Sequence, residues 1–176
     1  KINSKIIYNP EFLREKHANF DFKNSQMIIF GGDRNTASVV SKFYKLHSRC
    51  LTKEHIFLDL LSASLVKYAL NTFLATKVVF FNELFNLFEK LDTKDSWENI
   101  TDAISMDSRI GQSHMQVPGH DGKKGFGGAC FPKDSTALLK YSQSIGVDLD
   151  VLRTSISKNN KIRKKYSKLD DREKAQ

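Results

Sequence analysis

The order of apolar and polar positions divides the chain into an α/β start and a longer helical part. Short apolar runs at residues 6–8 and 27–30 are each followed by turn-forming residues, a pattern typical of short strands. A helix capped by Asn35 or Thr36 is expected to continue to about His47. Its apolar positions are Val39, Val40, Phe43 and Leu46. The first part of the chain is therefore predicted to be α/β.

Beyond this start, the spacing of apolar residues becomes that of helices. Residues 54–91 contain no Gly or Pro and repeat apolar side chains every three or four positions, which predicts one long helix. Further helices are expected after a cap at Ser96, with Pro132 in a first turn, and from Asp148. Residues 111–128 show no such periodicity and predict a long loop, which in a compact domain is usually functional.

These elements predict a mainly α fold, built on the long helix and preceded by a small α/β part. A chain of 176 residues, 40% of them hydrophobic, has room for one domain and part of another. We expect boundaries that give residues 1–50, 51–150 and 151–176. The long helix is interrupted by Lys67 and Asn71, so no uninterrupted apolar run is present to span a membrane.

The formal net charge of +8 is compatible with binding either nucleic acid or a small polyanion such as a nucleotide. Much of the excess lies near the end of the chain, where a basic run usually forms a solvated helix face or a frayed tail. The residues of that run are Lys158, Lys161, Arg163, Lys164, Lys165 and Lys168. Nucleic-acid binding is disfavoured, because bases stack on aromatic side chains and Tyr166 is the one aromatic residue between Lys158 and Lys168.

The cysteines bear on the cellular compartment of the protein, and the first residues bear on whether the chain is complete. Cys50 and Cys130 lie in no Cys-x-x-Cys or Cys/His spacing, so we expect no metal site and a reducing, cytoplasmic setting. The chain starts without Met and without the apolar core of a signal peptide, which predicts an incomplete chain.

Two polar residues fall on the apolar stripe of the long helix. Steps of three and four from Leu60 to Phe88 pass through Lys67 and Asn71 among otherwise apolar positions. A buried ammonium is costly unless an anion or a developing negative charge meets it. Either these two serve a site, or Lys67 extends to water at the edge of the core and Asn71 pairs with a backbone group.

Cys130 follows a glycine-rich segment and precedes Pro132 by two residues, which places it at the start of a helix. Backbone N–H groups and the helix dipole suit a nucleophilic cysteine there. Asp134, four residues on, is close enough to act as a base or to place a water beside the sulfur. The alternative is a small buried thiol that closes the loop, which is also how we interpret Cys50.

Three further charged residues have two interpretations each. Arg109 is suited to bind a phosphate or carboxylate, or to pair with Asp107 on the surface. Glu11 and Glu15 would share a helical face and form either a site or an exposed pair.

Four blocks of sequence resemble, in order and in residue type, the UDP-glucose/GDP-mannose dehydrogenase family. They are residues 9–15, 67–75 with 82–84, 109–111 and 125–134. The resemblance runs from about Ile6 to Leu139. It implies two successive oxidations with NAD at C6 of a nucleotide sugar, most simply UDP-glucose to UDP-glucuronate, through a thioester on the cysteine.

The resemblance also implies a role for each matching residue. The catalytic residues would be Cys130 as nucleophile, Lys67 and Asn71 stabilising a negative oxygen, Asp134 assisting water or proton transfer, and Glu11 in proton transfer. Glu15 and Lys133 would approach NAD. The nucleotide sugar would contact Phe12, Leu13, Phe126, Gly127 and, from a neighbouring subunit, Arg109.

The chain departs from the family pattern in ways that bear on its extent. It has no Gly-x-Gly-x-x-Gly, so the resemblance implies only the end of a Rossmann-type NAD-binding domain, in residues 1–50, followed by the central domain that forms the family's dimer core. Ser64 stands where the family usually has a glutamate. The prediction is a fragment of a homodimeric dehydrogenase, with a non-catalytic helical dimerisation module as the alternative.

Overall fold

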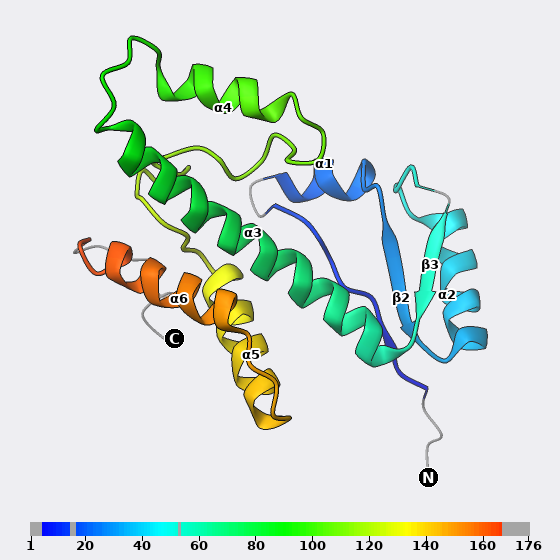
Figure 1. Ribbon diagram of the computed structural model, residues 1–176. Coiled ribbons are helices and arrows are strands. Elements are labelled where there is room, and N and C mark those ends of the chain that lie inside the picture. The colour runs from blue at the N-terminus through cyan, green and yellow to red at the C-terminus, as the bar shows by residue number, and fades with distance from the viewer. Residues whose placement is uncertain (1–4, 15–16, 53, 167–176) are drawn as a thin grey trace. The chain divides into compact units, whose positions relative to one another are not determined.

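The computed structural model describes residues 5–14, 17–52 and 54–166 (Figure 1). The chain divides into two compact units, residues 1–69 and 70–176, and the division falls within the long helix α3 (Leu60–Phe88). The predicted boundaries near residues 50 and 150 stay predictions.

The first unit is built on a three-stranded sheet in the order β1-β2-β3. The strands are β1 (Ile7–Tyr8), β2 (Ile28–Gly32) and β3 (His55–Leu58). β1 pairs antiparallel with β2, and β2 pairs parallel with β3. Helix α2 (Arg34–His47) makes the connection that a parallel pair requires. Buried Ile28, Phe30, Ala37 and Cys50 form the core of this unit.

The start and the orientation of α2 differ from the prediction. Asp33 caps the helix by accepting the Thr36 N–H at 3.0 Å, so the expected cap at Asn35 or Thr36 was wrong. An aspartate there accepts from the third residue after it, which is ordinary N-cap geometry. The helix turns Ala37 and Ser41 toward the core, while Val39, Phe43 and Leu46 are exposed. A short helix, α1 (Ala18–Lys23), was not predicted.

The long helix is shorter than its sequence pattern indicated. Residues 55–58 form β3, pairing in register from Ile28 opposite His55 to Gly31 opposite Leu58. Asp59 then accepts the Ser62 N–H at 2.9 Å and starts α3. A short apolar run next to a helix has no periodicity of its own, so the prediction of a helix from residue 54 was wrong at this end.

The second unit is helical, and the mainly α fold class is confirmed. After the rest of α3 come α4 (Trp97–Ser105), α5 (Phe131–Ser144) and α6 (Asp150–Arg163). The predicted cap at Ser96 is present and accepts the Asn99 N–H at 3.1 Å. Pro132 lies in the first turn of α5, as expected. The predicted loop at residues 111–128 contains no helix or strand.

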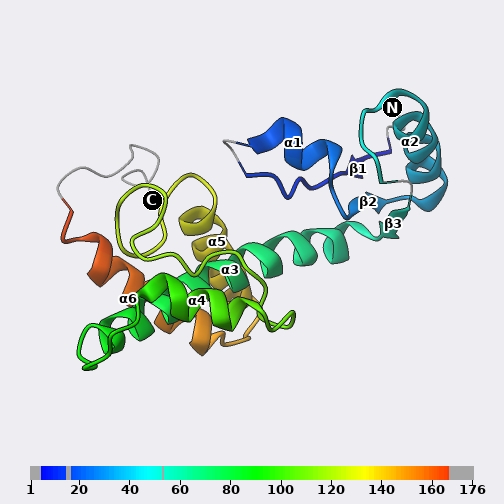
Figure 2. The same ribbon diagram turned by 90° about the horizontal axis from the view of Figure 1, so that it is seen from above.

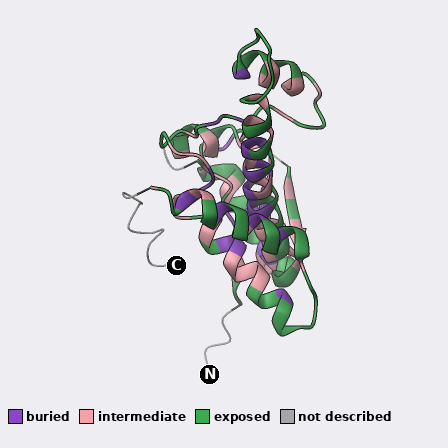
Figure 3. Cartoon of the chain, turned by 60° about the vertical axis from the view of Figure 1, so that its left-hand side comes forward, coloured by how far each residue is buried: buried purple, intermediate pink, exposed green. Residues whose placement is uncertain are grey.

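An apolar cluster packs α4 against α3 in the second unit. Trp97 of α4 packs with Phe81 of α3 and with Met115 and Val117, and its indole N–H donates to the Met115 carbonyl at 3.3 Å. Figure 2 shows α4 beside the end of α3, and Figure 3 shows buried residues recurring along α3. In the described part of the chain, no helix is both long enough and apolar enough to cross a membrane.

Candidate active site

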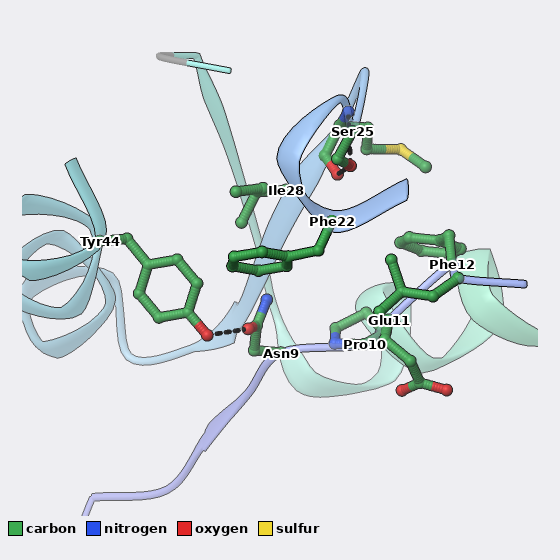
Figure 4. A pocket seen from close by; sticks show the side chains of 10 residues that line it. Asn9, Pro10, Glu11, Phe12, Phe22, Ser25, Ile28 and Tyr44 are labelled. Atoms are coloured by element: carbon green, nitrogen blue, oxygen red, sulfur yellow. Dashed lines mark hydrogen bonds between the residues drawn. The ribbon is translucent and has the colours of Figure 1, made fainter. Parts of the chain in front are cut away.

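In the first unit, the segment around Glu11 is fixed by its neighbour Asn9. The Asn9 amide donates to the Ile29 carbonyl at 2.8 Å and accepts the Tyr44 hydroxyl at 2.8 Å (Figure 4). One side chain therefore joins the segment after β1 to both β2 and α2. Because both amide groups are paired, the backbone that follows Asn9 has a defined course.

A small hollow lies beside this segment in the first unit. Phe12, Leu13, Phe22 and Ile28 supply its apolar lining (Figure 4). The Glu11 side chain also contributes to the lining, but its carboxylate points away from the ring of Phe22. Phe12 and Leu13, predicted to contact substrate, are therefore grouped with Glu11, while the substrate contact stays a prediction.

The ammonium of Lys67 meets an anionic partner in this unit. Its Nζ lies 2.9 Å from the Glu11 Oε1, donates to the Glu11 backbone carbonyl, and lies 5.4 Å from the centroid of the Phe12 ring. The Lys67 side chain is 12% exposed and that of Glu11 is 63% exposed. A largely buried cation thus pairs with a solvent-exposed carboxylate. The Ser64 hydroxyl donates instead to the Leu60 carbonyl at 2.8 Å.

In the second unit, Cys130 directly precedes α5 and its side chain is exposed. Its backbone carbonyl accepts the Asp134 N–H at 2.8 Å, which closes the first turn of the helix. The expected position at a helix start is confirmed, and the alternative of a buried thiol is wrong. Cys50 is buried in the core of the first unit, as predicted.

A buried amide–carboxylate pair lies one turn into α5. The Asn71 Nδ2 donates to the Asp134 Oδ2 at 2.5 Å, and these two residues are 8% and 2% exposed. Lys133 forms an ion pair with the other carboxylate oxygen. The amide of Asn71 thus donates to a carboxylate. The geometry unites two predicted site residues that are 63 positions apart in the sequence.

The loop before Cys130 is anchored by Phe126. This residue is buried with Ala75 and Val79 of α3, and its ring lies 6.3 Å from that of Phe131, the residue after Cys130. Gly127 is half-buried beside it. Their contact with substrate, and the approach of Lys133 to NAD, stay predictions. Glu15, the other predicted NAD contact, lies outside the described residues.

Arg109 forms the surface pair that its sequence context suggested. Its guanidinium binds Asp107 at 2.6 Å, which raises the pKa of Arg109 and lowers that of Asp107. The following residues are tied to α3, because the Lys77 Nζ donates to the carbonyls of Ile110 and Gly111 at 2.9 and 3.1 Å. Burial lowers the pKa of Lys77. A contact from Arg109 to substrate stays a prediction.

Several buried polar residues around the loop were missed by the sequence analysis. They are Asn82 on α3 and Asn159 and Arg163 on α6. Arg163 is 4% exposed and pairs with Asp121 at 2.9 Å, so the interpretation of the basic run as solvated was wrong for this residue. The signal available was spacing: from Leu152, steps of three and four reach Ser155, Asn159 and Arg163, all buried.

Chemically, the second unit offers an exposed thiol at a helix start and a buried carboxylate one turn later. Such a pair suits covalent catalysis in which the carboxylate handles water or a proton. Among the described residues, no group of three or more His, Cys, Asp or Glu side chains is placed to hold a metal ion.

Most of the chain, including the thiol and the acid of this helical unit, matches a known family model. The model of the "UDP-glucose/GDP-mannose dehydrogenase family, central domain" matches residues 61–161, more than half of the chain. The chain therefore belongs to the UDP-glucose/GDP-mannose dehydrogenase family, which confirms the resemblance found in the sequence.

Individual relatives agree with this membership. The chain is 36% identical over 159 residues to UDP-glucose 6-dehydrogenase TuaD of Bacillus subtilis, covering 90% of this chain and 32% of the relative. It is 33% identical over 154 residues to the UDP-glucose 6-dehydrogenase of Rickettsia conorii, covering 88% and 34%. The solved UDP-glucose dehydrogenase of Pyrobaculum islandicum superposes with a TM-score of 0.75 at 32% identity, covering 89% and 34%. The chain thus spans about a third of the length of these relatives.

Proposed function

We propose that this chain is part of an NAD-dependent enzyme that oxidises the C6 alcohol of a nucleotide sugar, UDP-glucose, to the carboxylate. The observation that carries the proposal is the exposed Cys130 at the start of α5, with the buried Asn71–Asp134 pair one turn later. Similarity to UDP-glucose 6-dehydrogenases supports the choice of sugar.

The proposed covalent step takes place at the Cys130 sulfur. The thiol adds to the C6 aldehyde to form a C–S bond, while the carbonyl oxygen becomes the hydroxyl of a thiohemiacetal. Loss of a hydride and a proton gives the thioester, and water then displaces the sulfur to release the carboxylate and the thiol. Overall, one alcohol and one water would give one carboxylate and three protons, with two hydrides transferred to two molecules of NAD.

Asp134 is proposed to position the attacking water or to accept its proton. Its carboxylate is buried and oriented by Asn71 on one oxygen and by Lys133 on the other. A side chain with both oxygens engaged loses little freedom when a water binds, which is the advantage of preorganised groups.

Lys67 and Glu11 are proposed to act as a charge-and-proton pair. The ammonium would stabilise negative charge on the reacting oxygen, and that charge is greatest in the transition state. The Glu11 carboxylate, 2.9 Å from the Lys67 Nζ, is exposed enough to exchange protons with water. These roles follow the family resemblance and extend it to the pairing of Lys67 with Glu11.

The described residues do not by themselves form a dinucleotide site. β2 leads into α2 through Gly31 and Gly32, but the chain has no Gly-x-Gly-x-x-Gly turn to receive a pyrophosphate. Lys133, exposed and paired with Asp134, is the described side chain proposed to face NAD. NAD would supply the hydride acceptor.

A second copy of the chain is the proposed partner of α3. Phe73, Phe80 and Leu87 recur every seven residues along one stripe of the helix and are 64%, 55% and 55% exposed. Large apolar residues that stay exposed along a helical stripe are typical of helix–helix interfaces. A homodimer that covers this stripe fits the proposed enzyme, and the two unpaired cysteines fit a cytoplasmic location.

The test follows NADH formation by the complete encoded protein supplied with UDP-glucose and NAD. Cys130→Ala and Cys130→Ser should abolish sustained turnover, whereas Cys50→Ala, which alters the buried thiol, should retain it. Sustained turnover by either Cys130 variant would refute the nucleophile. Absence of NADH formation by the folded wild-type protein would favour the non-catalytic dimerisation module.

A further inference from the structure

Asn159 forms a two-point contact with the backbone of the loop before Cys130. Its Oδ1 accepts the Phe126 N–H at 2.7 Å, and its Nδ2 donates to the Phe126 carbonyl at 3.0 Å. Asn159 is 3% exposed on α6, 33 positions away in sequence. Both polar groups of a buried peptide residue are thus paired by one side chain. A side-chain amide suits this contact because it carries both a donor and an acceptor.

The residue before Phe126 shows how closely this contact is fitted. Gly125 has φ +80°, and a Cβ placed on it would lie 2.6 Å from the Asn159 Oδ1. Its N–H donates to the Asn82 Oδ1 of α3 at 3.0 Å. Two buried asparagines from two helices therefore hold consecutive peptide groups, and glycine leaves the room that Asn159 occupies.

A short chain of contacts connects this point to Cys130. The ring of Phe126 meets that of Phe131 edge to face, with centroids 6.3 Å apart. Phe131 is the first residue of α5 and follows Cys130 directly. Gly127 and Gly128 lie between Phe126 and Cys130 in the sequence. Fixing the Phe126 peptide therefore limits where the Cys130 backbone lies.

We propose that Asn159 is a positioning residue, which holds the 125–130 loop so that the Cys130 thiol is placed for attack. The expected effect of Asn159 on catalysis rests on the proposed function. The structural part, that Asn159 fixes the loop, stands apart from the reaction. Neither the resemblance nor the notable motifs of the sequence pointed to this residue.

The experiment compares Asn159→Leu, which removes both hydrogen bonds, with Asn159→Asp, which keeps the acceptor for the Phe126 N–H. Asn160→Leu is the matched control, since Asn160 is the adjacent, exposed asparagine of the same helix. Amide hydrogen exchange of residues 125–130 and the steady-state rate of NADH formation are measured on the complete encoded protein.

For Asn159→Leu we expect exchange in the loop to accelerate at least about tenfold, and kcat per folded protein to fall at least about tenfold, because small displacements of a reacting group have large effects on rate. The KM for NAD should stay within about twofold of wild type, which a general loss of structure would not allow. Asn159→Asp should give an intermediate kcat. Asn160→Leu should match wild type in all three measurements.

Unchanged loop exchange in Asn159→Leu, or kcat within about twofold of wild type for both Asn159 variants, would overturn the proposal. If Asn159→Leu does not fold, Asn159→Asp decides by the same criteria. Sustained turnover by Cys130→Ala would defeat the proposed nucleophile, and loop exchange would still report whether Asn159 holds the loop. An effect of Asn160→Leu equal to that of Asn159→Leu would also refute the assignment.

Discussion

The contact between Asn71 and Asp134 allows a quantitative test of the candidate site. The two side chains are bonded at 2.5 Å and are 8% and 2% exposed, so water competes little for either group. A hydrogen bond to a charged group contributes roughly 1.5–3 kcal/mol to stability. A double-mutant cycle of Asn71→Ala, Asp134→Ala and the double variant should therefore give a coupling energy in that range.

Urea unfolding of the 176-residue chain provides the assay. Trp97 is the single tryptophan and lies in the core of the second unit, so its fluorescence reports the unfolding of the part that contains the pair. The control cycle uses Lys158 and Glu83, which lie 2.8 Å apart with both side chains 51% exposed. Exposed ion pairs contribute less than about 1 kcal/mol. Equal coupling in the two cycles would refute the inference that burial strengthens the Asn71–Asp134 contact.

Three further predictions concern separate parts of the chain. Lys67→Ala should lower kcat by about a hundredfold and change KM less, as expected for a group that stabilises charge in the transition state, and an unchanged kcat would contradict this. Ser96→Ala should lower the free energy of unfolding by roughly 0.5–2 kcal/mol through loss of the α4 cap, whereas Ser105→Ala, at the half-buried last residue of α4, should change it by less than about 0.5 kcal/mol. Hydrogen bonds from Arg14 lower the pKa of Asp21 from 3.8 to about 2, so the associated stability is present above pH 3.8 and is lost as the pH falls through 2. An NMR titration should find the Asp21 pKa higher in Arg14→Ala but still below 3.8, because the backbone N–H of residue 14 continues to donate to Asp21 at 2.8 Å, and a value still near 2 would assign the shift to a cause other than the guanidinium.

Elements whose signals are local were predicted well from the sequence. Ser96 caps a helix through an N–H three residues away, and Pro132 fits a first turn, so each signal lies within one turn of its effect. β3 was missed because its strand geometry depends on pairing with β2, about 27 residues earlier in register, and an apolar run carries no record of that partner.

The residues of the candidate site also differ in whether the sequence alone could predict them. Lys67 and Asn71 were recognised because each interrupts an apolar stripe, which is visible in the sequence alone. Asn159 and Arg163 lie on a helix whose buried face is largely polar, so no apolar stripe marked it. Their partners, Phe126 and Asp121, are 33 and 42 positions away, and only the folded chain brings them together.

The different exposure of the two cysteines has a practical consequence. Cys50 is enclosed in the core of the first unit, while Cys130 faces solvent at the start of α5. A maleimide fluorophore, a spin label or an electrophilic inhibitor would therefore react selectively with the Cys130 thiol, without mutation of Cys50. The protein thus has a native site for selective labelling at the residue where the proposed chemistry occurs.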